Sequence, residues 1–268
     1  MTLSPNIPAW IAIARTQVRI AYTYRLNMLT AVLLTGLQIY LLTLVWKAAY
    51  GDQTEVAGIG VGQMLVYLTL ANLQLRFLRP EMDTQIQERI RQGQIGFDLS
   101  RPVGYPSQLL AAATGDMIGL LPMLVVAFPV AFVAGELRAP ASMEAGIGYM
   151  LALVLAWIVA AQLNLVIGLV SFWTLEMNGF RMVYTLVGNF ATGALVPLWF
   201  MPDLMRAIVQ LLPFQAIAFV PVSIYVGEPA TGAIGSALLL QVFWTGALVL
   251  VIRWIWGKAF RHTVIQGG

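Results

Sequence analysis

Six apolar runs of about 20 residues recur along this chain, and they constrain its fold more than any other feature. A helix needs about 20 mostly apolar residues to cross the hydrocarbon core of a bilayer. Charged residues make up only 10% of the chain, against about a quarter in soluble domains. The sequence therefore predicts an all-α polytopic membrane protein, with one transmembrane domain over residues 1–268. The expected spans are 26–46, 57–78, 107–134, 145–175, 182–200 and 232–256.

Prolines interrupt a further apolar segment, at 197–229. They divide it into pieces of about ten residues, each too short to cross a membrane. Non-helical backbone at membrane depth is tolerated only where protein buries it, so we expect a re-entrant helical hairpin that enters and leaves from one side. Two further spans are the alternative. The prolines are Pro197, Pro202, Pro213, Pro221 and Pro229.

The basic residues predict the orientation. Twelve of the fifteen Lys and Arg residues fall on one side of the six-span arrangement, and Lys47, Arg138 and Arg206 fall on the other. Because basic residues concentrate in cytoplasmic loops, we expect a multi-pass protein of the cell membrane with both termini in the cytoplasm and the proline-rich hairpin outside. The twelve are Arg15, Arg19, Arg25, Arg76, Arg79, Arg89, Arg91, Arg101, Arg181, Arg253, Lys258 and Arg261.

An amphipathic helix is expected ahead of the first span, over 8–25. At helical spacing, Arg15, Thr16, Arg19 and Thr23 gather on one side of this segment. Such a helix lies along the headgroups of membrane lipids, with its arginines toward anionic lipid. A simple N-terminal extension of the first span is the alternative.

The connection between the second and third spans, 80–97, contains a predicted cytoplasmic helix over 81–92 and a turn. Pro80 suits the start of a helix, because its missing N–H would be unpaired there. Acidic residues follow in the first turn and basic residues fall in the last turn, an arrangement that the helix dipole favours. Gly93 and Gly96 then end the helix.

Three apolar residues of this helix, Met82, Ile86 and Ile90, lie four apart and form a narrow stripe on a polar rod. A stripe of this kind can insert into a groove of another protein, while the flanking charges fix the register. Alternatively, it packs against the helix ends of the same chain, and the charges are simply solvated. The periodicity alone leaves both interpretations open.

Motifs of several enzyme classes are absent from the sequence. No G-x-x-x-x-G-K-[ST] motif occurs, since the single Gly-Lys pair, Gly257-Lys258, is followed by Ala259. The sequence has no H-E-x-x-H motif, no G-x-S-x-G motif and no cysteine. We therefore expect neither catalysis nor a bound cofactor or metal on this chain.

Asp116 is an acidic residue within the third predicted span. An intramembrane carboxylate is costly, so it marks either a gate or pathway residue, or a side chain bonded to a neighbouring helix or loop arginine near the cytoplasmic interface. The length of this span favours the second interpretation. Ala111, Gly115 and Gly119 lie four apart beside it and would let another helix approach closely.

Gln162 and Asn164 in the fourth span are candidates for hydrogen bonds between helices, with a place along a substrate path as the alternative. Gly188 and Gly193 in the fifth span permit close packing, either between two subunits or within one chain.

Two segments resemble permeases of the ABC-2 transporter family. The run GQIGFDLSRPVGYPSQLL, at 93–110, is similar to the segment that follows the cytoplasmic helix in that family, with Asp98 to Val103 as its centre. Ser100 departs from the apolar residue that many relatives keep there. The run VPLWFMPDLMRAIVQLLPFQAIAFVPVSIYVGEP, at 196–229, is similar to the extracellular re-entrant segment of the family.

This resemblance implies the transmembrane subunit of an ABC exporter. It implies a pathway formed with a second copy or a sister permease, and two separate ATPase subunits that carry ATP and Mg. The expected substrate is a hydrophobic or amphipathic molecule, or a lipid-linked glycan. The helix after the second span would contact the ATPase. The contacting residues would be Glu81, Met82, Gln85, Ile86, Arg89, Ile90 and Arg91.

Two other functions fit the composition. A secondary transporter would show internal repeats and ionisable residues near the midplane, and here Asp116 is the one candidate for such a residue. A non-transporting membrane anchor of a complex would need neither feature. No pattern indicates a nucleic-acid partner.

Overall fold

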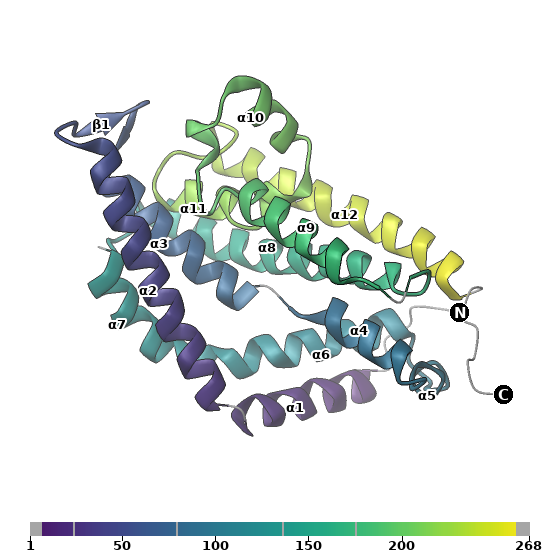
Figure 1. Ribbon diagram of the computed structural model, residues 1–268. Coiled ribbons are helices and arrows are strands. Elements are labelled where there is room, and N and C mark those ends of the chain that lie inside the picture. The colour runs from purple at the N-terminus through teal and green to yellow at the C-terminus, as the bar shows by residue number, and fades with distance from the viewer. Residues whose placement is uncertain (1–6, 24, 79, 136, 175, 261–268) are drawn as a thin grey trace.

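The computed structural model describes residues 7–23, 25–78, 80–135, 137–174 and 176–260. Arg79 and Arg261, two of the basic residues used to predict orientation, lie outside this part, as does the side chain of Arg25. The described chain is mostly helical (Figure 1). Four stretches in it are long and apolar enough to cross a membrane: Met28–Tyr50, Tyr105–Val133, Met143–Phe172 and Ile234–Ala259. They correspond to the first, third, fourth and sixth predicted spans.

Three of these stretches have simple boundaries. The first belongs to α2 (Arg25–Tyr50), the third to α8 (Met143–Val170) and the last to α12 (Ile234–Ala259). Ser142 caps α8, because its side chain accepts a hydrogen bond from the backbone N–H of Ala145.

The remaining candidate stretch is bent rather than one straight helix. It consists of α6 (Tyr105–Leu120), the 3₁₀ helix η1 (Leu121–Met123) and α7 (Leu124–Gly135). Pro122 lies in η1, where its missing N–H and its ring interrupt the helical hydrogen-bond ladder. Figure 1 shows the chain change direction between α6 and α7.

The second predicted span begins later than expected. A hairpin of two short strands, β1 (Glu55–Val56) and β2 (Ile59–Gly60), occupies its first residues, and α3 (Val61–Leu78) follows. Ala57 and Gly58 both have positive φ, as the two-residue turn of a tight hairpin requires. The all-α prediction missed this hairpin, which is small.

The helix α3 is not among the candidate spans, because its polar side chains lower its mean hydropathy. Most of the helix is nevertheless buried inside the protein. These side chains bond to non-helical backbone elsewhere in the chain. Tyr67 donates to the carbonyl of Gly193 at 2.9 Å, and Asn72 donates to that of Ala194 at 3.1 Å. Gln74 donates to two further carbonyls, at 217 and 218, each at 3.1 Å. Because these carbonyls are paired, irregular backbone can lie inside the helical bundle.

The fifth predicted span is too long by nine residues at its end. The helix here, α9 (Asn178–Ala191), stops because Gly193 has a φ of +80°, a conformation that favours glycine. A methyl group on Gly193 would lie 2.9 Å from the Tyr67 hydroxyl oxygen. Gly193 therefore ends a helix and packs within the chain, and α9 is too short to count among the candidate spans.

The proline-rich segment folds into short helices, each too short to cross a bilayer. The first part holds η2 (Leu198–Phe200) and α10 (Asp203–Gln210). The second part holds η3 (Pro213–Ala216) and α11 (Phe219–Tyr225), and it is buried against α3 and α8. The guanidinium of Arg206 ties the first part together by donating to the carbonyls of Leu198, Trp199 and Met201 at 2.8–3.0 Å.

The predicted N-terminal helix is present as α1 (Ile7–Thr23), and it runs alongside α6 (Figure 1). Arg15, Thr16, Arg19 and Thr23 are all exposed. Ala14 and Ala21 face Gly115 and Gly119, where an added methyl group would lie 2.3 Å from the Ala14 carbonyl oxygen and 2.5 Å from the Ala21 Cβ. This confirms the prediction that the small residues of the third span admit another helix at close range.

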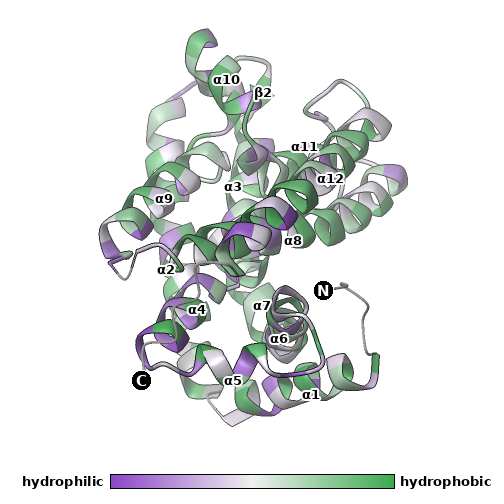
Figure 2. Ribbon diagram, turned by 90° about the vertical axis from the view of Figure 1, so that its right-hand side faces the viewer, coloured by the Kyte–Doolittle hydropathy of each residue, from purple (hydrophilic) through white to green (hydrophobic). Residues whose placement is uncertain are grey.

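The elements divide between two ends of the molecule. Figure 1 shows the β1–β2 hairpin and α10 at one end, and α4, α5 and the last turn of α12 at the other. In Figure 2, hydrophilic residues gather on α4 and near its junction with α5. The polar connection between the second and third spans therefore lies at the end opposite to α10.

Candidate functional site

The predicted helix of the polar connection is present as α4 (Met82–Arg91), one residue shorter at each end than expected. Gly93, with a φ of +68°, follows its C-terminus. The first turn has an unusual cap. The residue at the N-cap position, Glu81, makes no side-chain hydrogen bond to it, and the Oδ1 atom of Asn164 in α8 accepts instead from the backbone N–H of Asp83 at 2.9 Å.

The apolar stripe of α4 faces the inside of the chain, so the interpretation as a stripe offered to another protein needs correction. Met82 is 1% exposed and Ile86 is 0% exposed, and both pack in a cluster with residues of α6 and α8. Ile90 is half-buried beside them. The close approach depends on Gly168 of α8, where a methyl group would lie 2.4 Å from the Ile86 Cδ1 atom. The stripe faces inward because burying its apolar area against α6 and α8 is favourable.

The opposite side of α4 is polar and exposed. Of the seven residues expected to contact an ATPase, Glu81, Arg89 and Arg91 are exposed, and Gln85 is half-buried. Thr84, Glu88 and Gln92, which the sequence reasoning left out, are exposed as well. A partner that meets α4 would therefore contact charged and polar side chains.

A buried polar network holds α4 to two helices. The carboxylate of Asp83 forms an ion pair with Arg181 of α9, with 2.8 Å between Oδ2 and Nε. The Nη2 atom of Arg181 also donates to the Oε1 atom of Gln87 at 2.6 Å, one turn further along α4. The Nδ2 atom of Asn164 donates to the Asp83 Oδ1 atom at 3.4 Å. Asp83 and Gln87 are both buried, so this side of α4 is fixed rather than solvated.

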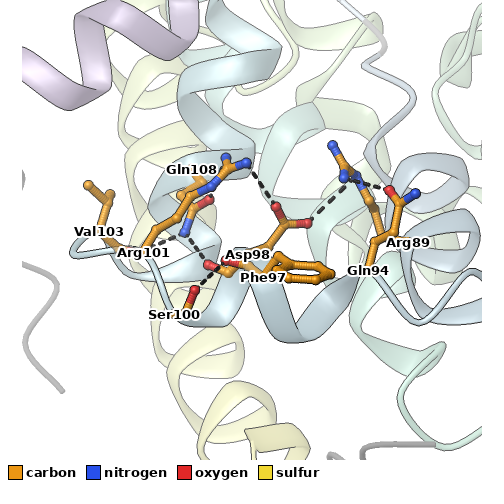
Figure 3. Close-up of polar contacts among 8 residues, drawn as sticks. All are labelled: Arg89, Gln94, Phe97, Asp98, Ser100, Arg101, Val103 and Gln108. Carbon is orange, nitrogen blue, oxygen red and sulfur yellow. Dashed lines mark hydrogen bonds and ion pairs between the residues drawn. The ribbon is translucent and has the colours of Figure 1, made fainter. Parts of the chain in front are cut away.

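After α4 the chain turns through α5 (Ile95–Leu99), and a second polar cluster fixes the turn (Figure 3). Its centre is Asp98, which is 4% exposed. The carboxylate oxygens of Asp98 lie 3.6 Å from the Nε atom of Arg89 and 3.3 Å from the Nη2 atom of Arg101. A buried carboxylate between two guanidinium groups keeps its charge compensated. The segment Asp98 to Val103, which carries the family resemblance, is thus held in one folded turn by these contacts. We call this segment the clasp.

Gln108, at the start of α6, closes this clasp. Its Nε2 atom donates to the carbonyl oxygens of Asp98 and Val103, each at 2.8 Å, and its Oε1 atom accepts from Arg101 at 3.3 Å. Since Gln108 is buried, these bonds satisfy groups that water cannot reach. The turn is therefore bonded to both helices, to α4 through the Arg89–Asp98 pair and to α6 through Gln108.

Phe97 is exposed at the outer side of the clasp, with 75% of its surface accessible (Figure 3). Its carbonyl accepts a hydrogen bond from the Ser100 hydroxyl at 2.8 Å, which fixes the backbone beneath the ring. Large aromatic residues are frequent anchors of protein interfaces. The sequence contained Phe97 in the family-like run, but periodicity gave no sign that it would point outward.

A polar cavity of about 460 Å³ lies directly behind α4. It is bordered by α2, α3, α8 and α9, and Asp83, Asn164 and Arg181 of the buried network line it. Its polar lining residues are Thr35, Gln38, Asn72, Arg76, Glu81, Asp83, Thr84, Asn164, Arg181, Tyr184, Thr185 and Asn189.

The three predicted pathway residues have different positions. Asn164 lines the cavity and caps α4. Gln162 lies elsewhere on α8, where its Nε2 atom donates to the carbonyl of Thr245 in α12 at 3.2 Å, the role of a bond between helices. Asp116 is half-buried beside the Gln85 side chain, which bonds to it, and near Glu81. Neither Gln162 nor Asp116 is among the lining residues of the cavity.

The sequence reasoning missed several residues of this site. From the sequence, Asp83 is only one of the acidic residues in the first turn of the predicted helix, and Arg181 is only one of the twelve basic residues that predict orientation. The signal that was available is the spacing of Asp83 and Gln87, two polar residues four apart on the side of the helix next to the apolar stripe. It indicates a buried polar partner, but it does not say which one.

Comparison with protein families gives one match that covers nearly the whole chain. Residues 6–267 match the family described as ABC-2 family transporter protein. The matched region includes α4, the clasp, the cavity and the proline-rich segment. A comparison with curated proteins found no match.

Proposed function

Because the chain belongs to the ABC-2 family of transporter proteins, we propose that it is the transmembrane permease subunit of an ATP-driven exporter in the cell membrane. ATP and Mg would bind to two separate ATPase subunits, and a second permease, either another copy or a sister chain, would complete the pathway. The observation that carries the proposal is the construction of α4 and α5. They form a polar, exposed projection that the Asp83–Arg181 ion pair and the hydrogen bonds of Asn164 and Gln108 fix to the membrane helices.

A projection of this kind suits a coupling element. A motor protein can displace a permease only if the element that it contacts is attached firmly to the helices that must move. The Asp83 network attaches α4 to α8 and α9, and the Asp98 clasp attaches α5 to α6. We name the exposed side chains of this projection the docking face. It consists of Glu81, Thr84, Glu88, Arg89, Arg91, Gln92 and Phe97.

The proposed topology has six spans: α2, α3, the bent α6–α7 unit, α8, α9 and α12. With its 14 residues, α9 extends only about 21 Å, and the buried residues 192–194 would continue the crossing. The segment 197–229 would be a re-entrant hairpin on the extracellular side, and α1 would lie at the cytoplasmic membrane surface. The docking face and the end of α12 lie at one end of the molecule, which fits both termini being cytoplasmic.

The polar cavity supports the proposal that the substrate path runs along this side of the chain and that a second permease covers it. It is bordered by helices that would lie at membrane depth, where polar groups exposed to lipid are costly. An apolar groove along α2, lined by Leu34, Leu37, Leu41 and Val45 among others, shares Gln38 with the cavity. A second permease placed over this side would cover the polar groups and enclose the path.

The test is assembly with a P-loop ATPase, which is to be sought in the adjacent reading frames. We expect the purified permease to bind that ATPase, and we expect Phe97→Ser to weaken the complex about tenfold or more, because an exposed aromatic anchor would be lost. The matched control is Leu211→Ser, which removes a similarly exposed apolar side chain next to α10, at the opposite end. If the wild-type permease forms no complex, the proposed function is wrong. If Phe97→Ser and Leu211→Ser bind equally well, the docking face is placed incorrectly.

A further inference from the structure

Three helices meet at Asp83, and each has a different place in the proposed transport cycle. Asp83 belongs to α4, which carries the docking face, Asn164 belongs to α8, and Arg181 belongs to the first turn of α9. All three residues line the polar cavity. The start of α4 is thus part of the cavity wall, through the buried Asp83 and through Glu81 and Thr84 of the docking face.

Arg181 holds α4 at two points. It contacts Asp83 as a close ion pair and donates a hydrogen bond to Gln87 with a second nitrogen. Asp83 and Gln87 are four residues apart, so both lie on one face of α4. A guanidinium group can make such a two-point contact because its donors form a rigid fork, whereas a lysine offers one point of charge. The arginine therefore fixes the rotation of α4 as well as its distance from α9.

The face of α9 that holds α4 also lines the cavity. Tyr184, Thr185 and Asn189 line the cavity, and they follow Arg181 at spacings of three, four and eight residues. Residues at these spacings share one side of a helix. A rotation or shift of α9 would consequently move the Arg181 contact and the cavity wall together.

We propose that Arg181 is the positioning residue that couples α4 to the cavity-lining face of α9, through its contacts with Asp83 and Gln87. This inference rests on the proposed function, since it assumes that an ATPase displaces α4. When ATP binding moves the docking face, the Asp83–Arg181 pair carries the displacement to Thr185 and its neighbours, and the cavity changes its accessibility. Asn164 keeps the N-terminus of α4 on α8 and so provides the fixed point for this movement.

The experiment uses the natural absence of cysteine. Thr185→Cys places a single thiol in the cavity wall, because the chain contains no cysteine. The rate of its modification by a maleimide is measured in the assembled permease–ATPase complex, with and without ATP trapped by vanadate. We expect the rate to differ between the two states. We expect Arg181→Gln to remove that difference while ATPase binding and ATP hydrolysis persist.

Two further variants and one control make the result decisive. Asp83→Asn should remove the same difference, and the double variant Asp83→Asn with Arg181→Gln should lose nothing more, since the two residues act as one unit. Arg181→Lys should restore part of the difference, because the charge remains and the fork is lost. Arg253→Gln changes an exposed arginine of α12 and should leave the difference intact.

Failure of this inference and failure of the proposed function give different outcomes. If Thr185→Cys alone forms no complex, or shows no ATP-dependent change, the proposed function fails. If Arg181→Gln keeps the change, the coupling role is overturned. If Arg181→Gln prevents ATPase binding, Arg181 supports only the fold of the docking face, and the coupling role is overturned as well.

Discussion

Single glycines decide how closely the helices of this protein approach. Gly115 in α6 lies against the backbone of α1, and Gly168 in α8 lies against Ile86 and the backbone of Asp83. Apolar side chains in lipid gain little from leaving it, so helices in a membrane associate through close packing. Glycine at these two contacts therefore stabilises the packing, because any larger residue would hold the helices apart.

Gly115→Ala is expected to separate α1 from α6. The added methyl group would lie 2.3 Å from the carbonyl oxygen of Ala14, a backbone atom that cannot rotate away. Overpacking of this kind costs about 1–3 kcal/mol, so the unfolding temperature in detergent should fall. The control is Gly246→Ala in α12, where nothing lies within 4 Å of the added carbon. That change should leave stability equal or higher by about 0.5–1 kcal/mol, because alanine favours a helix. Equal unfolding temperatures for both variants would contradict the packing of α1.

At the scale of elements, α4 and α5 act as one unit with the membrane helices because their polar groups are paired. Asp83 is paired with α9, while Asp98 and its clasp are paired with the start of α6. A buried polar group without a partner costs about 1–3 kcal/mol, so these contacts are specific as well as stabilising. The turn between α4 and α6 packs Ile95 and Leu99 against the apolar cluster of Met82 and Ile86, and the clasp pairs its buried polar groups.

Gln108→Leu is expected to open the clasp without unfolding the bundle. It leaves the carbonyls of Asp98 and Val103 without their donor in a site that water does not reach. Amide hydrogen exchange over 92–104 should become about tenfold faster or more, since about 1–3 kcal/mol of local stability is lost. Exchange in α8 should stay unchanged. Gln92→Leu is the control, because Gln92 is exposed and bonds only to the exposed Glu88 among the contacts that the structure gives it. Slow exchange in Gln108→Leu would show that other contacts hold the turn.

At the scale of the whole molecule, irregular backbone is enclosed by helices. The carbonyls at 193, 194, 217 and 218 accept hydrogen bonds from polar side chains of α3, and the carbonyl at 216 accepts one from Gln241 of α12. Every one of these acceptors would be costly in lipid, so they explain why α3 is polar and buried. The same arrangement leaves α10 and the docking face at opposite ends.

The proposed topology predicts that these two ends lie on opposite sides of the membrane. Gln92→Cys and Asp203→Cys, made one at a time, each introduce a single exposed thiol. In intact cells, a membrane-impermeant maleimide should label Asp203→Cys, and it should label Gln92→Cys only after the membrane is permeabilised. Permeabilised cells labelled at both positions serve as the control for reactivity. Protection of both thiols in intact cells would contradict the extracellular hairpin.

Local patterns in the sequence determined much of the fold. Proline and glycine placed the ends of α4 within one residue, the amphipathic spacing predicted α1, and the five prolines predicted the short helices of 197–229. The first, third, fourth and sixth apolar runs correspond to the four candidate spans. These features follow from the chemistry of neighbouring residues, because helix length, caps and breaks depend on only a few consecutive side chains.

Only the tertiary structure decided which residues of α4 are available to a partner and what holds them in place. Met82 and Ile86 are buried because Gly168 of α8 lets α4 approach closely. Asp83 is paired because the fold brings Arg181, 98 positions further along the chain, beside it. The sequence by itself determined that α4 is a helix with one apolar and one charged side. Which side meets the protein depends on helices distant in sequence, since burial and ion pairing are set by contact in space and not by local spacing.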